Sequence, residues 1–120
     1  MSEGKLRTRI ADAIRSDGHL HELVTAACHA LGDIVGADGA EVRADWSLVA
    51  DHQGRTIVRL DLSDFTGRAE AKFSPDEMEN PRQVRFRLYR IWGDLLQIRS
   101  HKQLKQLTEE SGSEVDANAP

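Results

Sequence analysis

Three short segments in the middle of the chain alternate apolar and polar residues, and this alternation constrains the fold more than any other feature. The segments cover residues 41–48, 55–62 and 68–73. Successive side chains of a strand point to opposite faces of a sheet, so each segment predicts a strand with one apolar face. Residues 51–54 and 63–67 separate the segments and have the composition of tight turns. The sequence therefore predicts a three-stranded antiparallel meander whose apolar face must be covered.

Helical periodicity precedes these segments. Apolar residues recur every three or four positions in residues 5–15 and form one continuous stripe in residues 19–35. This spacing places them on one side of a helix and leaves polar residues on the other. We therefore expect two amphipathic helices before the first strand, and both would cover apolar surface elsewhere in the domain.

A long helix is predicted after the meander. Ser74 and Glu77 have the spacing of a capping box, and Pro81 suits the first turn of a new helix that continues to Leu107. At about 100° per residue, its apolar residues form two seams that lie roughly 140° apart. The first seam consists of Val84, Leu88, Ile91, Leu95 and Ile98, with Trp92 at its edge. The second seam consists of Phe86, Tyr89, Gly93, Leu96, Ser100, Leu104 and Leu107.

These elements predict an α+β fold in the order α-α-β-β-β-α, with the long C-terminal helix packed on the sheet. Residues 1–107 would form a single domain. Residues 108–120 are small, acidic and aperiodic, which predicts a disordered acidic tail. The predicted core consists of Trp46, Leu48, Val58, Leu60, Phe73, Leu88, Ile91, Trp92 and Leu95.

The second seam predicts an interface. A helix over residues 81–107 would be about 40 Å long, whereas a compact domain of this size is only about 35 Å across. The part of the second seam near Leu96, Leu104 and Leu107 therefore lacks a predicted partner in the chain. Gly93 and Ser100 are small enough to let another helix approach closely. We expect a homodimer or docking on another protein; the alternative is that the N-terminal helices cover the seam and the helix end frays.

The charge is unevenly distributed. The whole chain has a formal net charge of -4, but the only acidic residue in residues 81–107 is Asp94, among seven basic ones. Possible phosphate contacts are Arg82, Arg85, Arg90, Arg99, Lys102 and Lys105. However, these side chains spread around the helix instead of forming one stripe. They could instead pair with acidic residues of the same chain or lie over apolar surface.

Outside residues 81–107, the sequence gives only weak signals of a metal-binding or catalytic site. Residue types that bind metals occur close in sequence at His19, His21, Cys28 and His29. On a helix these side chains diverge and cannot form a tetrahedral site. Glu41, Asp45 and His52 could share a proton, but no nucleophile or oxyanion donor accompanies them. We therefore predict no catalytic, cofactor-binding or metal-binding residues and no enzymatic activity.

The sequence carries no motif that assigns it to a family. It favours a non-enzymatic protein–protein interaction module, such as a scaffold, adaptor or regulator, that forms a homodimer through residues 81–107. The first alternative is a nucleic-acid-binding protein that uses the basic helix, and a third is a small enzyme with a site at a dimer interface. We expect a cytoplasmic protein without a membrane partner, because no apolar run approaches a membrane span and the only cysteine is Cys28.

Overall fold

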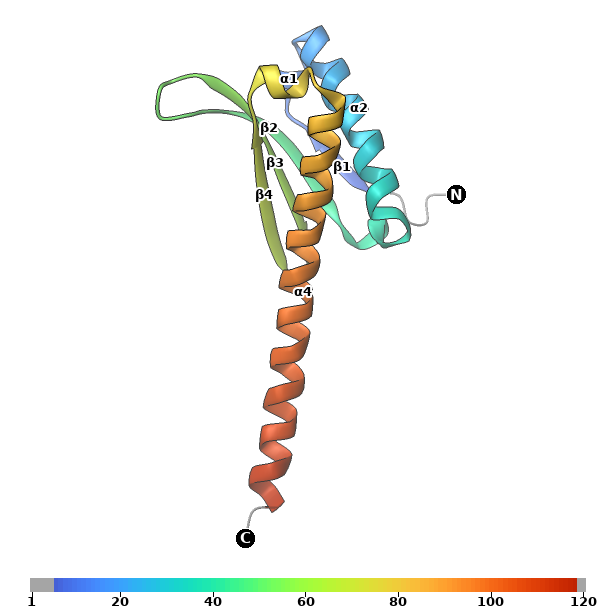
Figure 1. Cartoon of the computed structure of the whole chain (residues 1–120), viewed down its shortest axis with the longest axis vertical. Helices are drawn as coiled ribbons and strands as arrows, with labels where there is room; N and C mark the ends of the chain where they lie inside the picture. Colours follow the sequence, from blue (N-terminus) through green and yellow to red (C-terminus); the bar gives the residue numbers. More distant parts are fainter. Residues whose placement is uncertain (1–5, 119–120) are drawn as a thin grey trace.

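The computed structural model describes the backbone of residues 6–118, and the side chains of these residues except at positions 38, 40 and 109–118. Its elements in chain order are β1 (Arg7–Ile10), α1 (Asp12–Arg15), α2 (Gly18–Val35), the 3₁₀ helix η1 (Gly36–Glu41), β2 (Arg43–Ala50), β3 (Thr56–Asp64), β4 (Gly67–Phe73), α3 (Pro75–Met78) and α4 (Pro81–Asn118). The α+β class is confirmed, with α4 packed on the sheet (Figure 1).

The meander is confirmed and gains a fourth strand. Strands β2, β3 and β4 pair antiparallel in the order predicted, and β1 adds to the free edge of β2 in parallel. The prediction of a helix over residues 5–15 was therefore wrong for its first half, because Arg7–Ile10 pair with the backbone of Arg43–Trp46. A helix this short is marginal by itself, so the hydrogen bonds available at a sheet edge decide its conformation. Only Asp12–Arg15 remain helical, and they bury Ile14.

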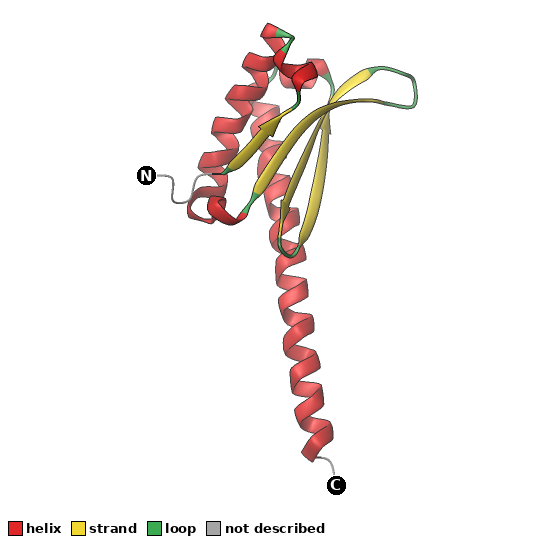
Figure 2. Ribbon diagram, turned by 180° about the vertical axis from the view of Figure 1, so that it is seen from behind, coloured by secondary structure: helices red, strands yellow, loops and turns green. Residues whose placement is uncertain are grey.

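Both long helices lie on one face of the sheet, and the other face is open (Figure 2). The inward side chains of β2, β3 and β4 form the core with α2 and the first seam. All the predicted core residues are buried except Leu48, which is half-buried against the core. Trp46 stacks on Phe73 at 6.1 Å between ring centroids. The open face is polar and contains cross-strand ion pairs, such as the 2.8 Å contact between Arg59 and Glu70.

Local signals fix most element boundaries. The Asp17 carboxylate accepts a hydrogen bond from the Leu20 backbone and begins α2. Gly36 ends α2 with a φ of 62°, a conformation that glycine adopts without strain. The capping box of Ser74 and Glu77 is present and begins α3.

Helix α4 is longer than the sequence predicted. Its backbone remains helical through Asn118, past Leu107 and into the segment predicted to be a disordered tail. A helix of 38 residues spans about 57 Å, and the molecule measures 67 × 41 × 25 Å along its principal axes. The second half of α4 consequently extends beyond the sheet and the other helices (Figure 1). The extended half of α4 can therefore make contacts outside the domain.

Candidate functional site

The two seams of α4 have opposite environments. Along the first seam, Val84, Leu88, Ile91 and Leu95 are buried against the sheet and α2. The second seam faces away from them. Its four large exposed side chains are Phe86 at 67%, Tyr89 at 54%, Leu104 at 62% and Leu107 at 59% exposure. Gly93 and Ser100 between them are also exposed, and Leu96 is half-buried. Only Leu96, at the edge of the second seam, packs against the core, and the described residues leave the rest of this surface uncovered.

The second seam is narrow and follows the helix axis closely. At about 100° per residue, its seven members fall within a sector about 80° wide. A straight stripe of this width is what a helix presents to one neighbouring helix. Isolated apolar residues are normal on protein surfaces, but four large ones in one line are not. The second seam is therefore the candidate interface.

The basic residues of α4 divide into an exposed group and a group that forms ion pairs with other described residues. Arg82, Arg85, Arg90, Lys102 and Lys105 are exposed. Arg99 is different, because its side chain is only 15% exposed and donates to Asp64. The guanidinium of Arg87, which was not among the proposed phosphate contacts, pairs with Glu77 at 2.7 Å and lies over the Phe73 ring. These two pairs follow the alternative that some of the basic side chains serve contacts within the chain.

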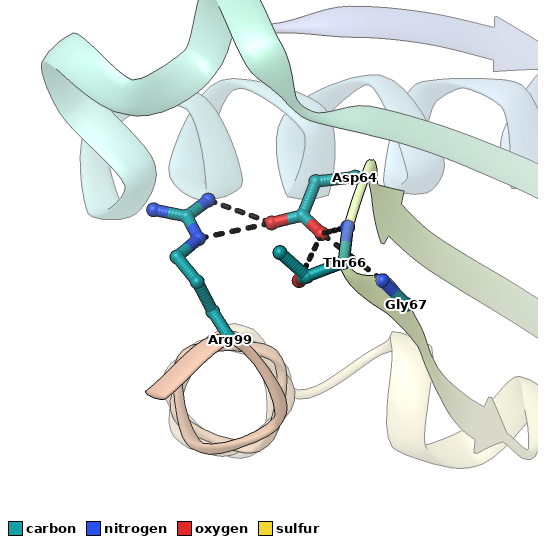
Figure 3. Close-up of polar contacts among 4 residues, drawn as sticks. All are labelled: Asp64, Thr66, Gly67 and Arg99. Carbon is teal, nitrogen blue, oxygen red and sulfur yellow. Dashed lines mark hydrogen bonds and ion pairs between the residues drawn. The ribbon is translucent and has the colours of Figure 1, made fainter. Parts of the chain in front are cut away.

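Asp64 and Arg99 form a polar clamp between α4 and the β3–β4 turn (Figure 3). Asp64 Oδ2 accepts from Arg99 Nη2 at 2.7 Å and from Nε at 3.1 Å. Its Oδ1 accepts from the backbone N–H groups of Thr66 at 2.7 Å and Gly67 at 3.2 Å, and from the Thr66 hydroxyl. Every acceptor of this buried carboxylate is thus used.

The clamp shifts the ionisation of Asp64. Burial opposes the charged form, but the hydrogen bonds from Thr66 and Arg99 outweigh it and hold the pKa of Asp64 below its usual value. The carboxylate is therefore charged at neutral pH and cancels the charge of Arg99. This clamp lies near the point where α4 leaves the sheet, so it fixes the direction of the extended half.

A hollow of about 660 Å³ lies between α4 and the β3–β4 turn. Its lining is Thr66, Asp94, Gln97, Ile98, His101, Lys102 and Lys105. Phe65, at the tip of the same turn, is 75% exposed. Two lysines, a histidine and one carboxylate make this surface basic overall. It lies on the side of α4 away from the second seam, because Lys102 and Lys105 fall within about 60° of the first seam's direction.

The structure places the N-terminal histidines on α2 and describes the surroundings of His19 and of the nearby Cys28. His19 is exposed and its Nε2 donates to the Glu79 carboxylate, and this hydrogen bond and the negative charge of Glu79 raise the pKa of His19. Burial raises the pKa of the Cys28 thiol to about 11. Within the part of the chain that the structure describes, no group of three or more His, Cys, Asp or Glu side chains could hold a metal ion. None of its helices there is both long and apolar enough to cross a membrane.

Sequence reasoning identified the turn at residues 63–67 but missed its partner. A turn sequence shows that Asp64 can bond to its own backbone. It does not show which of the helix arginines, more than thirty residues later, reaches the remaining oxygen. Phe65 was missed as well, because a single aromatic in a turn gives no periodic signal.

Comparison with protein-family models, curated protein sequences and solved structures finds no match for this chain.

Proposed function

We propose that this protein is a non-enzymatic interaction module that forms a homodimer through the second seam of α4. One observation carries the proposal: Phe86, Tyr89, Leu104 and Leu107 are all more than half exposed and lie in one line. Exposed apolar area of this kind is removed from water when two helices pair, which is favourable by about 25 cal/mol for each Å² buried. A scaffold, adaptor or regulator would use the paired helices as a rigid connection between two domains.

The extended half of α4 supports this proposal. Leu104 and Leu107 lie beyond the sheet, where the described part of the domain provides no neighbour for them. A helix in a protein gains most of its stability from packing rather than from local propensity. A partner helix on the second seam would supply that packing.

The test is the solution mass of the wild-type protein and of a charged variant. We expect multi-angle light scattering to give the mass of a dimer for the wild type and of a monomer for Leu104→Glu with Leu107→Glu. The matched control is His101→Glu with Gln106→Glu, which introduces two carboxylates into the same exposed turns outside the second seam and should remain dimeric. A monomeric wild type, with stability unchanged by the leucine substitutions, would refute the proposal.

Nucleic-acid binding is a second candidate. The observation that favours it is the basic hollow lined by His101, Lys102 and Lys105 and by Thr66, whose neighbour in the chain is the exposed Phe65. Single-stranded nucleic acids bind surfaces that combine cations with aromatic rings on which bases stack.

The nucleic-acid candidate is tested with a labelled single-stranded oligonucleotide at low salt. We expect weaker binding for Lys102→Gln with Lys105→Gln and a steep loss of affinity as salt rises. Gln103→Ala, on the same turns of α4, is the matched control. Absence of binding by the wild type at low salt would exclude this function.

A further inference from the structure

Five of the seven members of the second seam are spaced symmetrically about Ser100, which suits one way of pairing two copies. From Gly93 through Leu96, Ser100 and Leu104 to Leu107, the steps are 3, 4, 4 and 3 residues. This series reads the same in both directions from Ser100. Such a pattern suits an antiparallel pair centred at Ser100, since each helix meets the other's residues in reverse order.

Ser100 also lies at the middle of α4. The helix begins at Pro81 and ends at Asn118, so nearly equal lengths lie on either side of Ser100. Two antiparallel copies centred there overlap along almost the whole helix. Centres farther from the middle of α4 shorten this overlap.

We propose that two copies of α4 pair antiparallel about a two-fold axis at Ser100, so that Leu107 of each copy packs against Gly93 of the other. This inference rests on the proposed function, since it names the partner and the orientation of the same surface. Leu96 of one copy then faces Leu104 of its partner, and the two Ser100 side chains meet on the axis.

The sizes of the side chains favour this orientation. In the antiparallel pair, the Gly93 layer contains one glycine and one leucine, and the Leu96 layer contains two leucines. In a parallel pair, Gly93 would face Gly93 and Leu107 would face Leu107. Two glycines would leave a gap where two leucines hold the helices apart, and close packing requires a nearly constant separation.

The charges along α4 also favour the antiparallel orientation. In sequence, residues 81–107 contain seven basic residues and one acidic residue, whereas residues 108–118 contain four acidic residues and no basic one. Antiparallel pairing places the basic half of each helix beside the acidic end of the other. A parallel pair would place like charges together and would be disfavoured.

The same arrangement accounts for the exposure of Phe86 and Tyr89. These residues lie on the half of α4 that packs on its own sheet, yet they face away from it. In the antiparallel pair, the C-terminal part of the partner's helix runs along this half and covers them. One helix contact thus covers the full length of the second seam.

Disulfide crosslinking distinguishes the orientation from the dimer itself. All variants carry Cys28→Ala, which removes the native thiol. Ser100 meets its own copy both in the proposed antiparallel pair and in a parallel pair in register, so Ser100→Cys should crosslink in either arrangement. Leu107→Cys alone meets its own copy only in a parallel pair, because in the antiparallel pair the two residues are separated by 14 positions, or about 21 Å along the axis.

The decisive sample mixes a Gly93→Cys chain with a Leu107→Cys chain of different mass. We expect a mixed disulfide and almost no homodimeric disulfide from either chain. Crosslinking of Leu107→Cys to itself, together with crosslinking of Ser100→Cys, would overturn the antiparallel orientation but keep the dimer. A failure of Ser100→Cys to crosslink would overturn the pairing centred at Ser100, and the solution mass of the same sample would show whether the dimer itself forms.

The three substitutions should leave the domain folded. Ser100 and Leu107 are exposed, and a Cβ at Gly93 would meet no atom within 4 Å in the single chain. The circular dichroism of each variant should therefore match that of the parent.

Discussion

The clamp between Asp64 and Arg99 gives the sharpest quantitative prediction of the structure. We consider Asp64→Ala and Arg99→Ala, singly and combined, as a double-mutant cycle. The Asp64 side chain has 0% exposure and the Arg99 side chain 15%. Each single change therefore leaves one charged group largely buried without its partner, whereas the double variant removes both charges.

The expected loss in the free energy of unfolding follows from this burial. Breaking a buried ion pair by removing one partner costs about 3–5 kcal/mol, and Asp64→Ala also removes the acceptor for the N–H groups of Thr66 and Gly67. We expect a loss of about 4 kcal/mol for Asp64→Ala. Arg99→Ala should cost about 2–3 kcal/mol, because the turn still donates to the remaining carboxylate. The coupling energy from the cycle should be about 2 kcal/mol.

Urea unfolding followed by tryptophan fluorescence measures these values. The Arg99 guanidinium lies 5.7 Å from the centre of the Trp92 ring, so one of the two tryptophans reports on the clamp itself. All four proteins should carry Leu104→Glu with Leu107→Glu, because dimer formation would make the apparent stability depend on concentration.

The stability contributed by the Asp64 carboxylate changes with pH in a definite direction. The pKa of Asp64 is lower in the folded protein than in the unfolded chain, so folding favours the charged carboxylate. Its contribution is complete above the unfolded pKa of about 3.9 and is lost as the pH falls through the folded value. A coupling energy below about 0.5 kcal/mol between pH 5 and 8 would refute the clamp as a stabilising contact.

Two further predictions concern packing and reactivity. A Cβ added to Gly67 would lie 2.8 Å from Ile98 Cγ2, so Gly67→Ala should lower the free energy of unfolding by about 1–3 kcal/mol. In the Ile98→Ala background the same change should cost much less; an equal cost in both backgrounds would contradict the contact. The Cys28 thiol, with its pKa raised to about 11, should react slowly with a disulfide reagent at pH 8 and quickly in denaturant. Fast reaction in the folded protein would contradict its burial.

The covered face of the sheet follows from local pattern. Alternation in β2, β3 and β4 predicted their order, their pairing and the burial of Trp46 and Phe73. Antiparallel neighbours joined by tight turns have little choice of partner, so the local sequence is sufficient. Strand β1 was not predictable in this way, because its partner β2 is more than thirty residues away and its parallel pairing uses backbone groups of any sequence.

The candidate interface also has a part that the sequence predicted and a part that it could not predict. Helical periodicity by itself separated the two seams of α4, because the positions of side chains around a helix depend only on their spacing. Which seam is buried depends on where α2 and the sheet lie, and the structure leaves Phe86, Tyr89, Leu104 and Leu107 exposed. The six possible phosphate contacts stay a prediction, although Arg99 is already engaged by Asp64.

The sequence by itself determined the α+β class, the meander and the existence of a long helix with two apolar sides, since each depends on residues close together in the chain. Only the tertiary structure decided that β1 is a strand, that Arg99 reaches Asp64, and that the second seam remains uncovered. These three features depend on contacts between residues far apart in sequence, and hydrophobic periodicity carries no information about such contacts.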